Sequence, residues 1–252
     1  MKISACFEKT FKENLRDWKI LILVIVFAPF FIYLMHFYFI NTETSFYNVE
    51  VFNLYIPPML VLAVIMMLFT AGASIVREVE KDTISRLALS DLKSPAFLTA
   101  ISLNQIIIGL ISLVLTLLAA YSVGYRTTGS IPLLLLTGTL TCLSVISISF
   151  ITTCFIRTMF GLLTLGCFPF FIMVFFSDCF MPLPKINLFS IAGNQFYLTD
   201  ILPTATSSRV LNEVLNNDAI LPDIKVELLF MAIMTVIYSL MAIWLFKRKY
   251  KY

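Results

Sequence analysis

Six long and almost uninterrupted apolar runs dominate the pattern of hydrophobic and polar positions in this 252-residue chain. Each run is close to or above the roughly 20 residues that a helix needs to cross a hydrocarbon layer about 30 Å thick. The runs are continuous rather than alternating, which favours helices over the strands of a membrane barrel. The pattern therefore predicts an all-α integral membrane protein forming a single domain over residues 1–252. The expected transmembrane helices lie at about 20–40, 54–76, 97–123, 131–156, 159–180 and 226–246.

The lysines and arginines are distributed very unequally over the segments between these runs. Fourteen of the 18 lie in the N-terminal segment, in residues 77–95, directly after the fourth run or in the C-terminal tail. Cytoplasmic segments of membrane proteins carry an excess of positive charge, so both termini are expected in the cytoplasm. The even number of spans agrees with this orientation. We expect a multi-pass protein of the plasma (inner) membrane.

Residues 1–19 precede the first run and have an amphipathic pattern. Apolar side chains recur every three or four residues, at Ile3, Phe7, Phe11, Leu15 and Trp18, and charged residues occupy the opposite face. This spacing predicts a helix that lies in the cytoplasmic interface of the membrane. Such a helix is either a simple anchor or a docking surface for a cytosolic partner, and the sequence leaves both open.

The long outer segment at 181–225 contains four prolines, and its apolar runs are too short to cross a membrane. We expect one or two small helices there, covering the outer mouth of the bundle. Three ionisable residues are expected to pair near this segment: Asp178, Asp200 and Arg209.

Composition narrows the possible functions. The chain is 60% hydrophobic and only 13% charged, and its mean hydropathy is +0.93. These values exclude a soluble enzyme and a nucleic-acid-binding domain. The five cysteines contain no C-x-x-C pair, which makes a disulfide framework or zinc site improbable. No glycine is followed by lysine, so the chain has no P-loop for ATP. We therefore expect no catalytic residue, metal or cofactor in this chain, and any energy for transport must come from another polypeptide.

The segment at 77–90 continues the second run beyond the membrane. It places a small apolar set, Ile84 and Leu87, among several charged residues. A fully solvated loop has no need of such a set, whereas a short helix seated in the groove of a partner protein does.

The order of residues in this segment resembles the signature of type-2 ABC exporter permeases, the group of the daunorubicin-export permease. The resemblance extends over nearly the whole chain, because it includes the amphipathic N-terminal segment, Pro57-Pro58 in the second span and the aromatic, proline-rich end of the fifth. Asp82 stands where the family usually has glycine. This departure affects the expected geometry of the local turn and not the resemblance as a whole. The signature here is Arg77-Glu78-x-Glu80-x-x-Thr83-x-x-x-Leu87-x-x-Ser90, followed by Pro95 and a long apolar helix.

The resemblance implies a complex of two permease subunits, the second being a copy or a paralogue, with separate cytosolic ATP-binding subunits that hold ATP and Mg²⁺. It also implies that residues 77–90 form the coupling helix that contacts the ATP-binding subunit, and that short outer helices re-enter the membrane. The residues expected at this contact are Arg77, Glu78, Glu80, Thr83, Leu87 and Ser90.

The resemblance further implies that spans two and five line the dimer interface through which substrate passes. A path lined by methionine and phenylalanine suits hydrophobic or amphipathic cargo, such as a drug or an antimicrobial peptide, because these side chains repack easily. The alternative is that the same side chains simply face lipid or the core. The expected path residues are Met66, Met67, Phe69, Phe168, Phe171 and Phe175.

Two other functions remain open from the sequence alone. The cargo could be a lipid-linked polysaccharide, or the chain could be a membrane immunity or scaffold protein that transports nothing. An integral membrane enzyme is disfavoured, because no set of acid, base and nucleophile occurs in the spans.

Overall fold

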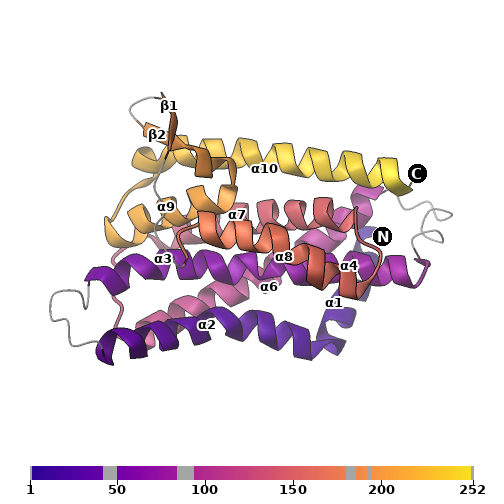
Figure 1. Cartoon of the computed structure of the whole chain (residues 1–252), viewed down its shortest axis with the longest axis horizontal. Coiled ribbons are helices and arrows are strands. Elements are labelled where there is room, and N and C mark those ends of the chain that lie inside the picture. Colours follow the sequence, from indigo (N-terminus) through magenta and orange to yellow (C-terminus); the bar gives the residue numbers. More distant parts are fainter. Residues whose placement is uncertain (1, 42–49, 84–93, 180–185, 192–193, 251–252) are drawn as a thin grey trace.

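The computed structural model describes residues 2–41, 50–83, 94–179, 186–191 and 194–250, which form an elongated helical bundle with one short hairpin (Figure 1). Its elements in chain order are α1 (Lys2–Arg16), α2 (Trp18–Asn41), α3 (Glu50–Ile65), α4 (Met67–Glu80), α6 (Ser94–Ser122), α7 (Ile131–Thr153), α8 (Met159–Phe176), β1 (Asn187–Ile191), β2 (Asn194–Tyr197), η1 (Leu198–Ile201), α9 (Pro203–Asn216) and α10 (Leu221–Tyr250).

The six predicted membrane spans are confirmed. Six helices are long and apolar enough to cross a membrane, and each coincides with one of the apolar runs. The second and sixth helices extend past the runs, since a helix can continue into polar residues once it leaves the hydrocarbon layer. The spans in the structure are Ile20–Tyr38, Phe52–Glu80, Pro95–Ser122, Ile131–Thr153, Met159–Phe176 and Leu221–Tyr250.

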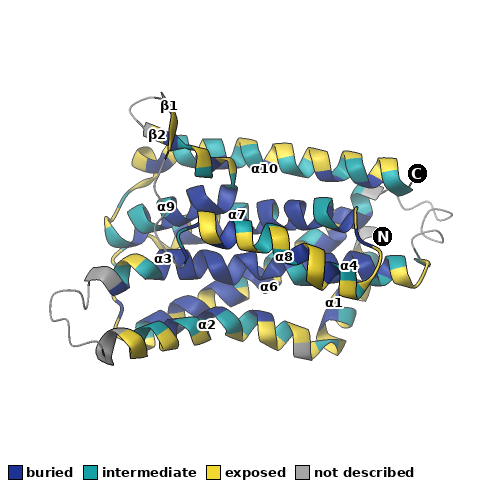
Figure 2. Ribbon diagram, in the orientation of Figure 1, coloured by how far each residue is buried: buried dark blue, intermediate teal, exposed yellow. Residues whose placement is uncertain are grey.

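The bundle has a buried centre and a more exposed outer layer (Figure 2). The span made of α3 and α4 lies in the centre, with 94% of its most apolar window buried. In α2, α8 and α10 the corresponding share is only 17–22%. A helix that is hydrophobic all round but mostly exposed in its own chain must face lipid or another protein subunit.

The central span continues from α3 into α4 through Met66, which keeps helical backbone angles (φ −57°, ψ −23°) and donates its N–H to the Leu62 carbonyl at 3.1 Å. Polar side chains from two neighbouring helices meet α4 just after this point. Thr70 Oγ1 donates to Gln105 Oε1 of α6 at 2.9 Å. Ser149 Oγ of α7 donates to the Leu68 carbonyl at 2.6 Å. Buried hydrogen bonds of this kind hold transmembrane helices in one register.

The outer segment differs from the expectation of helices alone. Strands β1 and β2 pair in an antiparallel hairpin, and they are followed by η1 and α9. Helix α9 lies alongside the spans rather than beyond their ends: Ser207 Oγ is 2.6 Å from Thr141 Oγ1 of α7, and Tyr238 of α10 donates to the Ile201 carbonyl at 3.0 Å. Re-entry of α9 into the membrane stays a prediction.

Both termini lie at one end of the bundle, and the hairpin lies toward the other end (Figure 1). The basic segments that identify the cytoplasmic side in the sequence therefore gather at one end of the molecule. Which side of the membrane this end occupies remains a prediction from charge.

Candidate coupling site and transport surface

Arg77 connects the last turn of α4 to the N-terminal helix. Its guanidinium forms an ion pair with Asp17 just after α1, and Nη2 donates to Asn14 Oδ1 at 3.4 Å. Its Nε also donates to the Ala73 carbonyl at 3.1 Å, which fixes the side chain along its own helix. The planar guanidinium with five donors can satisfy all three acceptors at once. The end of α4 is therefore held against the polar face of α1.

Glu78 makes a second connection to α1, and its side chain is only 5% exposed. Lys9 Nζ lies 2.5 Å from Glu78 Oε1. Partial burial alone lowers the pKa of Lys9, but the adjacent Glu78 carboxylate outweighs this effect, and the pKa ends above its ordinary value. Thr83 Oγ1 donates both to the Glu78 carboxylate and, at 3.0 Å, to its carbonyl. The buried carboxylate is thus compensated by a cation and a hydroxyl.

Glu80 joins the same segment to span five. Its Oε1 accepts a hydrogen bond from the backbone N–H of Met159, the first residue of α8, at 2.6 Å. The first N–H groups of a helix have no partner inside the helix, and the helix dipole attracts negative charge to this end. Thr158 completes the cap by accepting from Gly161 N at 3.0 Å. Glu80 therefore stabilises the start of α8 from the end of α4.

The turn after α4 contains a residue in the left-handed region. Asp82 has φ of 51°, a conformation that costs most side chains energy and that glycine adopts freely. Aspartate is among the few other residues that tolerate it. Asp82 therefore meets the conformational requirement of this turn without a glycine.

The structure brings four of the six predicted coupling residues together within seven residues: Arg77 and Glu78 contact α1 or the residue after it, Glu80 contacts α8, and Thr83 bonds to Glu78. The other two, Leu87 and Ser90, lie outside the described residues. Contact with an ATP-binding subunit stays a prediction for all six. Sequence reasoning missed the partners Lys9 and Asp17 within the chain, although their charges, opposite to those of Glu78 and Arg77, were the available signal.

The predicted path residues fall into two separate groups. Met66 and Met67 are 7% and 0% exposed where α3 continues into α4, and Phe69 packs on Phe170 of α8 with ring centroids 5.3 Å apart. In contrast, three predicted residues of α8 are exposed by 73%, 49% and 48% in the single chain: Phe168, Phe171 and Phe175. The first group is thus part of the core, and the second forms an aromatic surface on α8.

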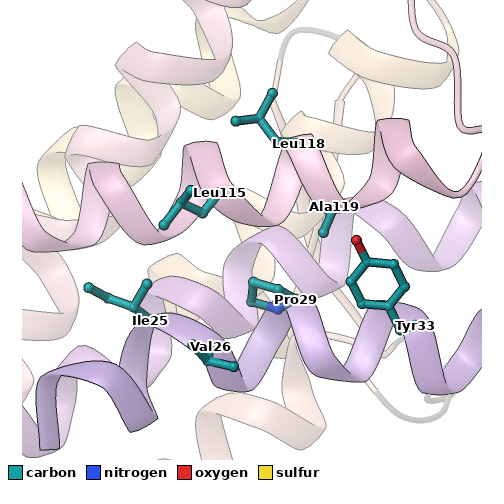
Figure 3. A pocket seen from close by; sticks show the side chains of 7 residues that line it. All are labelled: Ile25, Val26, Pro29, Tyr33, Leu115, Leu118 and Ala119. Carbon is teal, nitrogen blue, oxygen red and sulfur yellow. The ribbon is translucent and has the colours of Figure 1, made fainter. Parts of the chain in front are cut away.

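A shallow hollow of about 360 Å³ lies between α2 and α6 (Figure 3). The polar hydroxyl of Tyr33 is 2.7 Å from Ser122 Oγ, so it has a partner within the chain. The remaining lining side chains are apolar, as is typical of a surface that meets hydrocarbon. They are Ile25, Val26, Pro29, Leu115, Leu118 and Ala119.

The described residues contain no group of three or more histidine, cysteine, aspartate or glutamate side chains placed to hold a metal ion. The features of the described residues that bear on function are the contacts of α4 with α1 and α8 at one end and the apolar surfaces along the sides of the bundle.

Comparison with known families fits this architecture. The family model described as ABC-2 type transporter matches residues 1–199, which include α1, the first five spans and the coupling segment. No curated protein and no solved structure is similar enough to match the chain. The family model does not single out the daunorubicin-export group, which stays a prediction. Since the match covers well over half of the chain, this multi-pass membrane protein belongs to the ABC-2 type transporter family and is a permease component of an ABC transporter.

Proposed function

We propose that the chain is the transmembrane subunit of an ATP-driven exporter. Two permease chains, identical or paralogous, form the substrate path at their interface, and separate cytosolic subunits bind and hydrolyse ATP. The cargo is hydrophobic or amphipathic, with drugs and antimicrobial peptides as the leading classes. The family match supports a role as a transporter component. The export direction, the class of cargo, the permease dimer and the ATP-binding partner are what we propose.

The observation that carries this proposal is the set of contacts around the end of α4. Arg77 and Glu78 connect this end to α1, and Glu80 connects it to α8. A force applied to residues 77–90 by an ATP-binding subunit would therefore move the interfacial helix and the start of span five together with the central span. Coupling over such distances requires a contiguous set of packed or hydrogen-bonded elements, which is present here.

The aromatic surface of α8 supports a path at a dimer interface. Phe168, Phe171 and Phe175 are 73%, 49% and 48% exposed in the single chain, and α8 begins at the residue held by Glu80. Aromatic rings bind apolar groups without demanding one fixed shape, which suits variable greasy cargo. The same helix would thus receive the mechanical input at one end and meet the cargo along its length.

Substitution of Leu87 by aspartate tests the coupling. An apolar anchor in the groove of a partner contributes on the order of 1–3 kcal/mol, so Leu87→Asp should lower transport-stimulated ATP hydrolysis by about tenfold or more. The complex is purified with its ATP-binding subunit and assayed in proteoliposomes. Leu221→Asp is the matched control, because Leu221 is an exposed leucine at the start of α10. Hydrolysis and export that are unchanged in Leu87→Asp would refute the coupling role.

The aromatic surface is tested separately by measuring the susceptibility of cells to a panel of apolar drugs and antimicrobial peptides. We expect Phe171→Ala to alter resistance to some compounds while ATP hydrolysis without cargo is preserved. If the protein confers no resistance and transports none of the panel, a lipid-linked polysaccharide cargo or a scaffold role becomes the better explanation.

A further inference from the structure

The C-terminal end of α10 is held against the end of α7. The Lys249 ammonium donates to the carbonyl of Cys154, the residue that follows α7. The last carbonyls of a helix have no donor within the helix, and the helix dipole makes this end negative, so a cation stabilises it. The contact places the basic end of α10 beside the turn that joins α7 to α8, at residues 154–158.

Three exposed cations lie where these two segments meet: Arg157 in the turn, and Lys247 and Arg248 on α10. Arg157 is close enough to Lys249 for their positive charges to repel each other. None of the three exposed cations forms an ion pair with a residue that the structure describes. Glu80 contacts the same turn, but it bonds to the first backbone N–H of α8. This cluster of positive charge therefore lacks a counter-ion in the described part of the chain.

Exposed aromatic side chains accompany the cations. Trp244 is 56% exposed, and Arg248 Cζ lies 5.4 Å from the centre of its ring. Phe155, in the same turn as Arg157, is 71% exposed. Tryptophan is enriched at the boundary between hydrocarbon and lipid headgroups, and long basic side chains just beyond an apolar run reach the headgroups. Because the apolar run of α10 ends at Phe246, the cations lie at the level of the headgroups.

The face of α10 that carries Arg248 continues toward the membrane centre as an apolar stripe. Ile237, Leu240 and Met241 precede Trp244 at steps of three or four residues, so they lie on one side of the helix, and they are 50%, 62% and 46% exposed. From Ile237 to Arg248 the helix rises roughly 16 Å, which is close to half of a hydrocarbon layer about 30 Å thick. An acidic protein surface would match the cations but not the stripe, whereas a phospholipid matches both.

We propose that the adjoining ends of α7 and α10 bind an anionic phospholipid in the leaflet at the end of the bundle where both termini lie (Figure 1). Arg157 and Arg248 bind the phosphate oxygens, because a guanidinium can donate two parallel hydrogen bonds to a phosphate, and Lys247 adds a third charge. An acyl chain lies along the stripe from Trp244 to Ile237. A zwitterionic lipid brings its own cation to the cluster, so it binds more weakly than an anionic lipid.

Trp244 itself can report which lipid lies beside it. The chain has 2 tryptophans, so Trp18→Phe leaves Trp244 as the sole fluorophore. This full chain is reconstituted into vesicles of dioleoylphosphatidylglycerol and dioleoylphosphatidylcholine, with brominated acyl chains on one lipid or the other. Bromine quenches tryptophan only at contact, so the two series give the relative binding constant of the two lipids at Trp244. Arg157→Gln and Lys247→Gln each remove one cation and keep the Arg248–Trp244 contact. The matched control is Arg126→Gln, at an exposed arginine between α6 and α7.

We expect phosphatidylglycerol to bind beside Trp244 about tenfold or more tightly than phosphatidylcholine, and each cation removed to lower this preference about fivefold. Arg126→Gln should leave the preference unchanged. Equal binding of the two lipids, or an equal loss of preference in Arg126→Gln, would overturn the proposal. If one of the two variants does not fold, an unchanged preference in the other overturns it. Loss of quenching by both lipids when the ATP-binding subunit is added would instead identify a protein as the occupant.

Discussion

Removal of Lys9 from the Lys9–Glu78 ion pair should destabilise the protein much more than removal of Glu78. The pair joins α1 to the end of α4 across 2.5 Å, but its members are unequally exposed: the side chain of Lys9 is 48% exposed and that of Glu78 only 5%. Lys9→Met leaves a carboxylate buried without its cation. Glu78→Gln leaves an ammonium that can still reach water.

The magnitudes follow from this asymmetry. Breaking a buried pair so that one charge remains uncompensated costs about 3–5 kcal/mol. The Thr83 hydroxyl still bonds to Glu78, so Lys9→Met should lower the free energy of unfolding by an amount at the lower end of that range, about 3 kcal/mol. In Glu78→Gln the surviving ammonium is hydrated and lies 3.9 Å from Glu13, so the cost should be about 1 kcal/mol. The double variant should be less damaging than Lys9→Met alone, because no buried charge remains.

The docking of α1 on α4 is measured by hydrogen exchange of α1 amides in the purified protein, and coupling by transport-stimulated ATP hydrolysis. A double-mutant cycle over the four forms isolates the interaction of the two side chains. Lys12→Met is the control, because Lys12 pairs only with the exposed Glu8 of its own helix among the described residues. Equal effects of Lys9→Met and Glu78→Gln, or additive effects in the double variant, would refute the reasoning.

Three further predictions concern packing, capping and pH. Gly109→Ala should destabilise the protein by about 1–3 kcal/mol in thermal unfolding, because the added Cβ would lie 2.7 Å from Cys142 Sγ and closer still to Met67 Sδ; an unchanged midpoint would contradict this packing. Glu80→Gln should destabilise the first turn of α8 by about 0.3–1 kcal/mol, because it removes negative charge from the start of this helix. Greater protection of the first α8 amides from hydrogen exchange would contradict this prediction. Burial lowers the pKa of Lys9 but Glu78 raises it further, so the folded-state pKa exceeds the ordinary 10.5. The stability from this pair should be fully present below pH 10.5 and lost only as pH rises above it, a loss that Lys9→Met should abolish.

The membrane spans were predictable from sequence because the bilayer imposes a simple rule. Every backbone polar group in hydrocarbon must be satisfied within its own segment, so about 20 consecutive apolar residues specify a helix almost independently of the rest of the fold. The outer segment is not subject to this rule. The sequence predicts one or two small helices in residues 181–225, yet Asn187–Ile191 and Asn194–Tyr197 pair as antiparallel strands. Short apolar runs joined by a glycine were the available signal.

The hydrogen bonds that join α4 to its neighbours could not be predicted, because they connect residues that are far apart in the chain. The hydroxyl of Ser149 that bonds to the Leu68 carbonyl is 81 residues away in the chain. The same reason explains why the sequence could suggest coupling residues but not their partners within the chain: the signature is local, whereas the pairs with Lys9 and Asp17 span 60 residues or more.

The division of the predicted path into two groups limits how one chain can carry cargo. Met66 and Met67 can meet cargo only if the packing of α4 against its neighbours opens, because they are almost fully buried. Phe168 and Phe171 need no such opening, because they are already exposed on α8. Cargo that follows the proposed path would therefore meet the aromatic surface of α8 first, and the methionines only after α4 moves away from its neighbours. Since Glu80 joins α4 to the start of α8, force applied to the proposed coupling segment would act on both helices together.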